Sequence, residues 1–271
     1  NHSDGTEPMK VVLLAGGFGT RISEETSIRP KPMVEIGGNP ILWHIMRQYA
    51  AHGLTDFVIC AGYKSDYIRN YFLNYRNTRS DFTMNLRSGK VEFHETEAED
   101  WNVTVVDTGL NTMTGGRIKA ARQYIGDEPF CVTYGDGVSN VNITDLIQKH
   151  KESEAYATLT AVVQPGRFGG LSLDSNTGAV RSFREKAAED GNVINGGFFV
   201  CEPEVFDYID GPETIWERDP LERLVADNKL NAYRHFGFWQ PMDTLRDRNY
   251  LEGLWEKGDA PWAPEQLKRD A

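Results

Sequence analysis

The sequence predicts an α/β protein with a mostly parallel sheet flanked by helices, followed by a smaller strand-rich part and a C-terminal helix. Three observations lead to this prediction. Short apolar runs alternate with helix-like patterns through the first two thirds of the chain, as in βαβ units. Strand-like runs dominate from Thr158 onward, with shorter helical patterns between them. A helical pattern over Thr244–Trp255 then follows.

The first strand is expected over Val11–Leu14, an apolar run that opens with two β-branched residues. A glycine-rich loop follows it. The next element is expected to be a helix from about Ile41 to His52, because apolar residues recur there every four positions. Asn39 is expected to cap this helix, with Pro40 at its first position.

The remaining elements are predicted in the same way. Strands are expected over Phe57–Cys60, Val103–Val106, Phe130–Tyr134, Thr158–Val163, Ala179–Arg184 and Phe198–Cys201, and helices over Asp66–Phe72, Ile118–Tyr124 and Thr244–Trp255. Thr244 and Asp247 are expected to cap the last helix mutually. Its apolar stripe is expected in the core or at a subunit interface, together with the aromatic tail around Trp255, Pro261 and Trp262.

These elements form a Rossmann-like arrangement in one domain over residues 9–271. Its parts are expected at about 9–150, 151–243 and 244–271, since no long linker or repeat separates them. Residues 1–8 lack any periodicity and are expected to be a disordered leader or an added segment.

The most informative segment is Leu-Ala-Gly-Gly-Phe-Gly-Thr-Arg at 14–21, followed by Pro-Lys-Pro at 30–32. Glycines directly after a buried strand allow backbone N–H groups to turn toward an anion. Arg21 and Lys31 bring two cations to the same loop. The combination predicts a triphosphate site; the alternative is a tight turn whose glycines serve the backbone only.

Two common glycine-loop motifs do not fit this spacing. A dinucleotide-binding loop requires G-x-G-x-x-G, but counting from Gly17 and Gly19 the last position is Ile22. A Walker A loop requires Gly-Lys-Ser/Thr, which does not occur near this loop. The spacing of this loop therefore excludes an NAD-dependent oxidoreductase.

The glycine loop and the Pro-Lys-Pro segment resemble the signature of the sugar-1-phosphate nucleotidylyltransferases, G-G-x-G-T-R-L followed by P-K-P, with Ile22 in place of Leu. Further stretches resemble the members of that family that use CTP and glucose 1-phosphate: Asp107–Gly109, Met113–Arg117, Thr133–Gly137, Phe183–Lys186, Ile194–Phe199 and Phe238–Thr244. The resemblance runs in order from about Met9 to Trp262. It implies a Mg²⁺-dependent enzyme that makes CDP-glucose and pyrophosphate and feeds polysaccharide synthesis of the O-antigen type.

In such a transfer, two anions must be brought together, so cations and positioned carboxylates are expected rather than a covalent nucleophile. Asp136 and Asp243 are the candidate Mg²⁺ ligands, because carboxylate oxygens suit this hard cation; the alternatives are a turn aspartate and a residue at a helix start. Arg21 is assigned to the departing phosphates. Lys31 is assigned to both the nucleotide and the sugar phosphate.

The full expected nucleotide site comprises Leu14, Ala15, Gly16, Gly17, Gly19, Thr20, Arg21, Lys31, Thr112, Gly116, Arg117 and Asp136.

The resemblance also assigns the sugar side. Lys186 would hold the phosphate of the sugar, Glu185 and Asn195 would reach its hydroxyl groups, and Gly196 would belong to the same sugar-phosphate site. A solvated charge pair is the alternative for Glu185 and Lys186. Aromatic side chains at Tyr134, Phe168, Phe198 and Trp239 are further candidates to flank the sugar, although such residues are more often core.

Base choice is assigned to Arg117, because cytosine offers two adjacent acceptors to the donors of a guanidinium, whereas uracil places a donor at N3. Thr112 is expected to assist. The neighbouring glycines are expected to let the backbone approach the base from a loop between a strand and a helix. A helix-start arginine that faces solvent is the alternative.

Two other functions stay open at this point. A pyrophosphorylase for UTP, dTTP or another sugar 1-phosphate would keep the same phosphate chemistry. A regulatory protein could bind nucleotide without turnover, but the joint presence of Arg21, Lys31, Asp136, Lys186 and Asp243 argues against it.

Composition limits the partners. The net charge of −11 argues against nucleic acid and anionic membranes, and no apolar run reaches the length of a membrane span. Three separated cysteines, Cys60, Cys131 and Cys201, are expected to be buried thiols of a reducing compartment, and no His/Cys spacing suggests zinc. A cytoplasmic protein is expected, and the resemblance implies a homo-oligomer.

Overall fold

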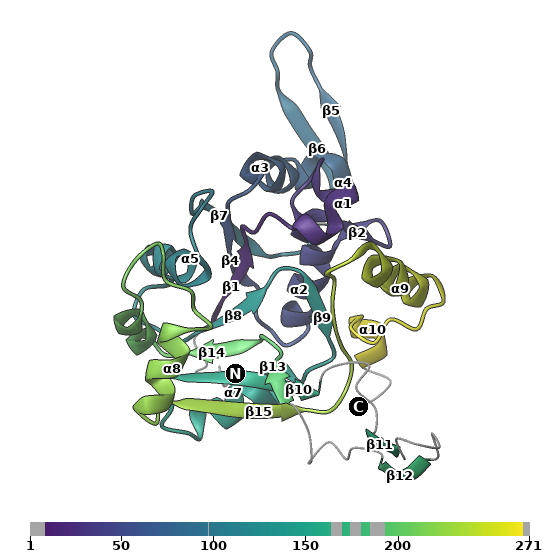
Figure 1. The fold of residues 1–271 in the computed structure, drawn as a ribbon. Coiled ribbons are helices and arrows are strands. Elements are labelled where there is room, and N and C mark those ends of the chain that lie inside the picture. Colours follow the sequence, from purple (N-terminus) through teal and green to yellow (C-terminus); the bar gives the residue numbers. More distant parts are fainter. Residues whose placement is uncertain (1–8, 97, 164–169, 174–179, 185–192, 268–271) are drawn as a thin grey trace, which may run out of the picture.

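The computed structural model describes residues 9–96, 98–163, 170–173, 180–184 and 193–267 (Figure 1). Its central sheet has eight strands: β1 (Lys10–Ala15), β4 (Asp56–Ala61), β7 (Asn102–Asp107), β8 (Phe130–Tyr134), β10 (Ala157–Val163), β13 (Val193–Asn195), β14 (Phe199–Cys201) and β15 (Leu230–His235). The order is β13-β10-β14-β8-β1-β4-β7, and β15 pairs with β10 in addition.

The first half of the chain forms the parallel part of this sheet. β1 lies between β4 and β8 and is parallel to both, and β7 continues the sheet parallel to β4. The later strands β14, β10 and β13 add antiparallel pairs beyond β8. The predicted shift from βαβ units to a strand-rich second part is therefore confirmed.

Side-chain alternation along β1 supplies both faces of the sheet. Val11, Leu13 and Ala15 belong to one buried cluster, and Val12 and Leu14 to the other. The first cluster is covered by α2 (Ile41–Ala50), α3 (Ser65–Leu73), α7 (Ile143–Lys151) and α9 (Leu245–Glu256), and the second by α5 (Thr114–Ala120), α6 (Arg122–Ile125) and α8 (Asp219–Ala226). Because both faces are buried, the strands carry nearly continuous apolar runs.

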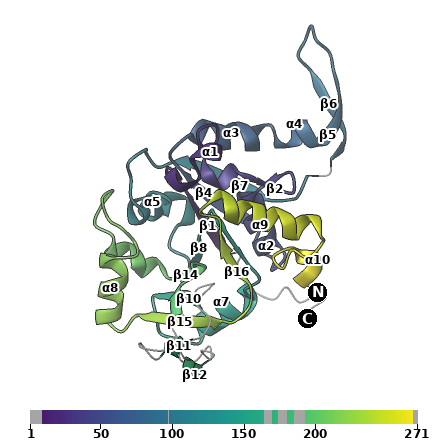
Figure 2. The ribbon, with the colours of Figure 1, turned by 45° about the vertical axis from the view of Figure 1, so that its right-hand side comes forward.

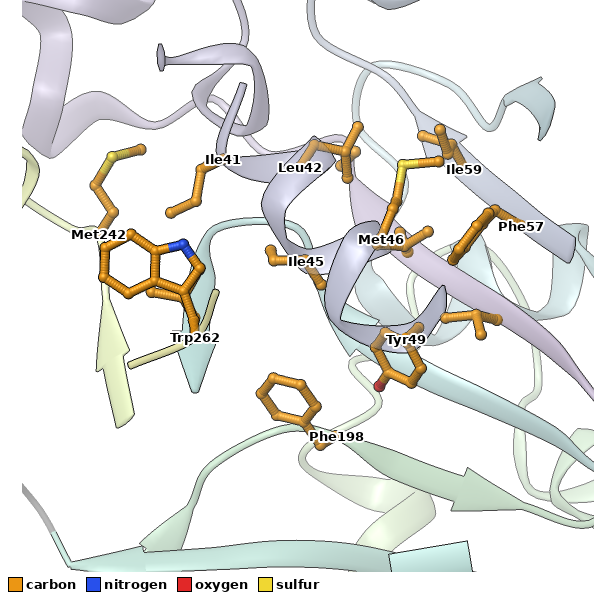
Figure 3. Close-up of a cluster of buried hydrophobic side chains, with 14 of the residues drawn as sticks. Ile41, Leu42, Ile45, Met46, Tyr49, Phe57, Ile59, Phe198, Met242 and Trp262 are labelled. Carbon is orange, nitrogen blue, oxygen red and sulfur yellow. The ribbon is translucent and has the colours of Figure 1, made fainter. Parts of the chain in front are cut away.

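Helix α2 forms the centre of the first cluster (Figure 3). Tyr49 near its end stacks on Phe198, with ring centroids 5.9 Å apart. Phe198 is thus a core residue, which is the alternative expected for it, and not a residue that flanks the sugar. The expected cap of this helix is also wrong: Pro40 occupies the N-cap position, and the Asn39 side chain accepts a hydrogen bond from Arg79 instead.

The last long helix, α9, confirms its predicted start. The Thr244 hydroxyl accepts from the Asp247 amide, and the Asp247 carboxylate accepts from the Thr244 amide, which is a capping box. Its apolar stripe packs on the core through Leu251. Trp262 beyond the helix is 1% exposed, so it packs within this chain and does not form a subunit contact.

Short elements complete the described chain. They are the strands β2 (Glu35–Ile36), β3 (Asn39–Pro40), β5 (Ser80–Met84), β6 (Val91–Thr96), β9 (Gly137–Ser139), β11 (Gly170–Leu173), β12 (Val180–Arg184) and β16 (Trp239–Pro241), the helices α1 (Ser23–Thr26), α4 (Tyr75–Arg79) and α10 (Pro264–Leu267), and the 3-10 helices η1 (Thr20–Ile22), η2 (Lys31–Met33) and η3 (Pro203–Tyr208). The hairpin β5–β6 projects away from the body (Figures 1 and 2). None of the described helices is long and apolar enough to span a membrane.

The three cysteines are buried and carry free thiols, as predicted. Burial raises the pKa of Cys60 to about 12 and that of Cys131 to about 12, so both thiols are protonated at neutral pH. Such groups are inert packing residues rather than nucleophiles.

Candidate active site

Two aspartates from distant parts of the chain meet at the carboxyl end of the parallel strands. Asp136 follows β8, as predicted, and Asp243 lies between β16 and α9. The short ladder between β9 and β16 pairs Gly137 with Pro241, and the Met242 amide donates to the Asp136 carbonyl at 2.8 Å. This backbone pairing fixes the spacing of the two carboxylates.

Lys31 joins these carboxylates. Its Nζ lies 2.9 Å from Asp136 Oδ2 and 2.9 Å from Asp243 Oδ1. The side chain is 12% exposed and enters from η2, whose backbone is restricted by Pro30 and Pro32. Burial acts to lower the pKa of Lys31, but the charges of Asp136 and Asp243 outweigh it and the pKa is raised. The lysine is therefore cationic at neutral pH.

Arg21 reaches the same cluster from η1. Its Nη2 lies 3.4 Å from Asp243 Oδ1, while 73% of the side chain is exposed. A pair this exposed contributes little to stability. Most of the guanidinium donors thus face the open side of the site, where a phosphate group can reach them.

The donor set fits a magnesium ion held partly by substrate. Asp136 and Asp243 offer oxygen ligands only, and the described residues contain no group of three or more His, Cys, Asp or Glu side chains that could form an all-protein metal site. Mg²⁺ is commonly bound by one or two carboxylates, with phosphate oxygens and waters completing its octahedron. The lysine bridge shows that one cation can contact both carboxylates.

A cavity of about 250 Å³ lies over the glycine loop. Its lining contains most of the residues predicted to hold the nucleotide, together with Pro32: Leu14, Ala15, Gly17, Gly19, Thr20, Arg21, Lys31 and Asp136. Gly19 has a left-handed backbone (φ 62°), and a Cβ there would lie 2.9 Å from the Thr26 side chain. The loop requires glycine at this position on both counts.

A second cavity of about 390 Å³ adjoins the first, because Leu14, Gly17 and Asp136 line both. It also contains Thr112 and Arg117, as well as Gly16, Phe18, Leu110, Asn111, Met113, Thr114 and Tyr134. The predicted nucleotide residues therefore gather along one continuous cleft.

Arg117 lies in the wall of this cleft but differs from its predicted setting. It belongs to helix α5, not to a loop, and is 5% exposed. Its guanidinium donates to the Thr108 hydroxyl at 2.7 Å and to four carbonyls, those of Gly16, Ala61, Gly109 and Leu110. The arginine thereby fastens the glycine loop to the ends of β4 and β7.

The glycines around Arg117 have packing roles. A Cβ on Gly16 or Gly62 would collide with the guanidinium, which explains why both positions lack a side chain. Gly116 packs against Pro212, where a Cβ would lie 2.7 Å from Cα, and Gly115 packs against Thr214 in the same way. The expectation that these last two glycines admit the base is wrong, because they admit the segment at 212–214.

The sugar side is described in part. Glu185, Lys186 and Phe168 lie outside the described residues. Asn195 ends β13, and its amide donates to the Tyr134 hydroxyl at 3.2 Å. The Gly196 carbonyl accepts from the Trp239 indole N–H at 2.9 Å. Through Tyr134, Asn195 is one hydrogen bond away from the nucleotide cleft.

Two groups in the site were not anticipated from the sequence. Glu217 accepts hydrogen bonds from both Thr114 and Tyr134, and Thr108 holds Arg117. Glu217 lies 83 residues from Tyr134 and 103 from Thr114, so no local pattern marks it. Thr108 lies within the stretch Asp107–Gly109 that carried part of the resemblance, which was a usable signal.

A larger cavity of about 520 Å³ lies elsewhere, among α3, α4 and β7. Its lining is largely aromatic and aliphatic and includes none of the predicted residues. Arg69, Arg76 and Glu99 also line that cavity, but we place the active site at the two smaller cavities because the glycine loop and the Lys31–Asp136 ion pair lie there.

Known proteins resemble this chain over most of its length. The family model for nucleotidyl transferases matches residues 10–242. The chain is 56% identical to the glucose-1-phosphate cytidylyltransferase of Salmonella typhimurium (strain LT2), covering 94% of this chain and 98% of that protein. It is 43% identical to the probable glucose-1-phosphate cytidylyltransferase of Bacillus subtilis, covering 94% and 99%.

The fold is also shared with more distant solved structures. The UDP-glucose pyrophosphorylase from Acinetobacter baumanii matches with a TM-score of 0.69 at 19% identity, covering 97% of this chain and 98% of that one. At this level of identity the likeness concerns the fold alone.

Proposed function

This chain belongs to the nucleotidyl transferase family, and from that premise we propose that it joins CTP and glucose 1-phosphate to give CDP-glucose and pyrophosphate. The observation that carries the proposal is the Asp136–Lys31–Asp243 bridge at the edge of the glycine-loop cavity. The 56% identity to a glucose-1-phosphate cytidylyltransferase supports the choice of substrates.

The reaction forms a bond between a phosphate oxygen of the sugar and the α-phosphorus of CTP, and it breaks the bond from that phosphorus to the β-phosphate oxygen. Glycine-loop N–H groups and the exposed Arg21 guanidinium receive the β- and γ-phosphates and the charge that develops on pyrophosphate. Lys31, held close to the reacting centre, reduces the repulsion between the two anions. These groups act by position and charge, so no covalent intermediate is needed.

Mg²⁺, when bound by Asp136 and Asp243 together with phosphate oxygens, would supply further positive charge at the transferred group. Lys31 contacts the same two carboxylates in this structure. We therefore propose that Lys31 exchanges carboxylate oxygens for phosphate oxygens when the substrates and the metal bind. This exchange keeps both carboxylates compensated in each state, which avoids leaving a charge unpaired.

Discrimination between CTP and other nucleotides is proposed to depend on Arg117 and Thr112. Both line the larger part of the cleft. The Arg117 donors are directed at loop carbonyls in this structure. Arg117 can therefore act on base selection in two ways: by fixing these loops, and by turning a donor toward the base. Direct bonding to cytosine O2 and N3 remains our prediction, and it requires the guanidinium to exchange some of its five present acceptors for the base.

The sugar phosphate is proposed to bind Lys186, with Glu185, Asn195 and Gly196 near the sugar hydroxyl groups. Lys186→Ala is expected to raise the KM for glucose 1-phosphate about tenfold or more, the loss of a charge-assisted hydrogen bond, while the KM for CTP changes far less. Equal changes in both constants would contradict this role.

We further propose a homo-oligomer in the cytoplasm whose product enters polysaccharide synthesis. Large apolar side chains are exposed on the projecting hairpin, with Phe82 at 51%, Met84 at 44% and Leu86 at 88%. A patch of this kind favours contact with another chain. Light scattering after size-exclusion chromatography tests this directly, and a mass of one chain would contradict it.

The test of the reaction is pyrophosphate release in the presence of Mg²⁺, measured over a matrix of nucleoside triphosphates and sugar 1-phosphates. The pair CTP and glucose 1-phosphate should give the highest kcat/KM. A higher value with UTP or dTTP, or with another sugar, would reassign the substrates within the same chemistry. Absence of pyrophosphate release from every pair would contradict transferase activity.

A further inference from the structure

Glu217 lies outside every motif used so far, yet its carboxylate touches both halves of the cleft. One oxygen, Oε2, accepts from the Thr114 hydroxyl at 2.7 Å, and the other, Oε1, accepts from the Tyr134 hydroxyl at 2.9 Å. Glu217 belongs to the segment at 211–218 that precedes α8. A carboxylate that uses each oxygen for a different structural element is suited to fix the distance between those elements.

On the nucleotide side, the carboxylate fixes the start of α5. The Thr114 hydroxyl donates to Glu217 and accepts from the Trp216 amide at 2.9 Å, so its orientation is determined at both ends. Thr114 lines the cleft beside Thr112 and Arg117. Movement of Thr114 would therefore move the wall that faces the nucleotide.

On the sugar side, the same carboxylate determines the direction of the Tyr134 hydroxyl. Because this hydroxyl donates to Glu217, its lone pairs are left to accept from the Asn195 amide. Asn195 in turn accepts from the Gly197 amide at 2.9 Å through Oδ1. Burial and the neighbouring Glu217 both raise the pKa of Tyr134, so the phenol keeps its proton.

We propose that Glu217 is a positioning residue that couples the two substrate subsites, holding Thr114 on the nucleotide side and the Tyr134–Asn195 pair on the sugar side. The inference rests on the proposed function, because it identifies the Asn195 side of the cleft with the sugar. It assigns no direct contact between Glu217 and a substrate.

The chemistry explains why a carboxylate is needed. An ionised Glu accepts hydrogen bonds at both oxygens, whereas Gln accepts at one and donates at the other. In Glu217→Gln, one of the two hydroxyl donors would face an NH₂ group and would have to reorient. If Tyr134 reorients, the hydrogen bond to Asn195 is lost with it.

The experiment compares three variants by their KM values for CTP and for glucose 1-phosphate. Glu217→Ala, which removes both acceptor oxygens, should raise both constants, each by about tenfold, the loss of one hydrogen bond to a charged group on each side. Thr114→Val should raise chiefly the KM for CTP, and Tyr134→Phe chiefly that for glucose 1-phosphate. Glu222→Ala, which removes an exposed glutamate side chain on α8, is the matched control and should leave both constants unchanged.

A double variant makes the coupling specific. In the Tyr134→Phe background, Glu217→Ala should no longer change the KM for glucose 1-phosphate but should still change that for CTP. A structural role alone would lower the melting temperature and leave both constants as they are. That result, or an undiminished effect on glucose 1-phosphate in the double variant, would overturn the inference.

The two proposals fail in different ways. If the wild type releases no pyrophosphate with any substrate pair, the proposed function and the coupling are overturned together. If the wild type is active and the single variants do not separate the two substrates, only the coupling is overturned. Should Glu217→Ala fold poorly, Thr114→Val and Tyr134→Phe still decide whether the two branches serve different substrates.

Discussion

The two sides of the nucleotide cleft compensate their charges in opposite ways. On the phosphate side, Lys31 and Arg21 are paired with the carboxylates of Asp136 and Asp243. On the base side, the charge of Arg117 is surrounded by backbone carbonyls and a hydroxyl. Ion pairs can exchange partners when a charged substrate and a metal arrive, whereas an arginine bonded to the backbone is part of the scaffold. Under the proposed function, the Lys31 side is thus arranged for an exchange of partners and the Arg117 side for holding the shape of the cleft.

The largest effect should come from removing a carboxylate on the phosphate side. Asp136→Asn or Asp243→Asn is expected to lower turnover by about 1000-fold, equal to about 4 kcal/mol of transition-state stabilisation. Initial rates of pyrophosphate release measure this. Chelation of Mg²⁺ by EDTA should abolish the wild-type activity.

The control for these two variants is that each keeps the wild-type fold. Both side chains are about one third exposed, at 32% and 31%. The circular dichroism spectrum and the melting temperature should therefore stay close to those of the wild type. A variant with near-normal turnover would remove that aspartate from the site.

A change at Arg117 should have a smaller effect, and this effect should be seen in the preference for CTP over UTP. Arg117→Ala is expected to lower the ratio of kcat/KM for CTP over UTP by about 1–3 kcal/mol if the guanidinium bonds the base. If Arg117 acts only by fixing Gly16 and the loops at 61 and 108–110, kcat/KM should fall by the same factor for both nucleotides. The ratio, measured beside the melting temperature, separates these roles.

A matched change at Gly16 sharpens that comparison. Gly16→Ala would push against the guanidinium without removing it. If Arg117 acts mainly by fixing the loops, this variant should lower kcat/KM for CTP and for UTP alike. Normal kinetics in Gly16→Ala would show that the loop tolerates displacement of Arg117.

The smallest effect concerns alkaline stability. The pKa of Lys31 is raised above its usual 10.5, so its contribution to stability is fully present below pH 10.5 and is lost as the pH rises through the folded-state value. Wild type should therefore lose more stability than Lys31→Met between about pH 9.5 and pH 11.5. Denaturant unfolding across this range measures the difference, and a constant gap between the two proteins would contradict the prediction.

Local signals predicted the fold well, and they predicted that the glycine loop and its two cations lie together. The apolar runs around Val11 and Phe130 located the parallel strands, and the glycine loop with its two cations lies within 17 residues of sequence, from Gly16 to Pro32. The capping pattern at Thr244 could likewise be predicted, because its two partners are three residues apart. Such features depend on neighbours along the chain.

Contacts between distant segments were harder to predict. Nothing beside Arg117 indicates that its donors meet carbonyls at 16 and 61, or that the glycines at 115 and 116 face residues 212–214. Trp262 lies in a tail whose burial depends on His44, 218 residues away. Glu217 is defined only by partners that the fold brings to it.

The exchange of partners on the phosphate side is tested most directly by CTP binding with and without Mg²⁺, measured by isothermal titration calorimetry on wild type and Asp136→Asn. Mg²⁺ should strengthen CTP binding to the wild type by about tenfold or more, since it releases Lys31 for the phosphates, and most of this gain should be absent in Asp136→Asn. An equal gain in both proteins, or no gain in the wild type, would contradict the exchange.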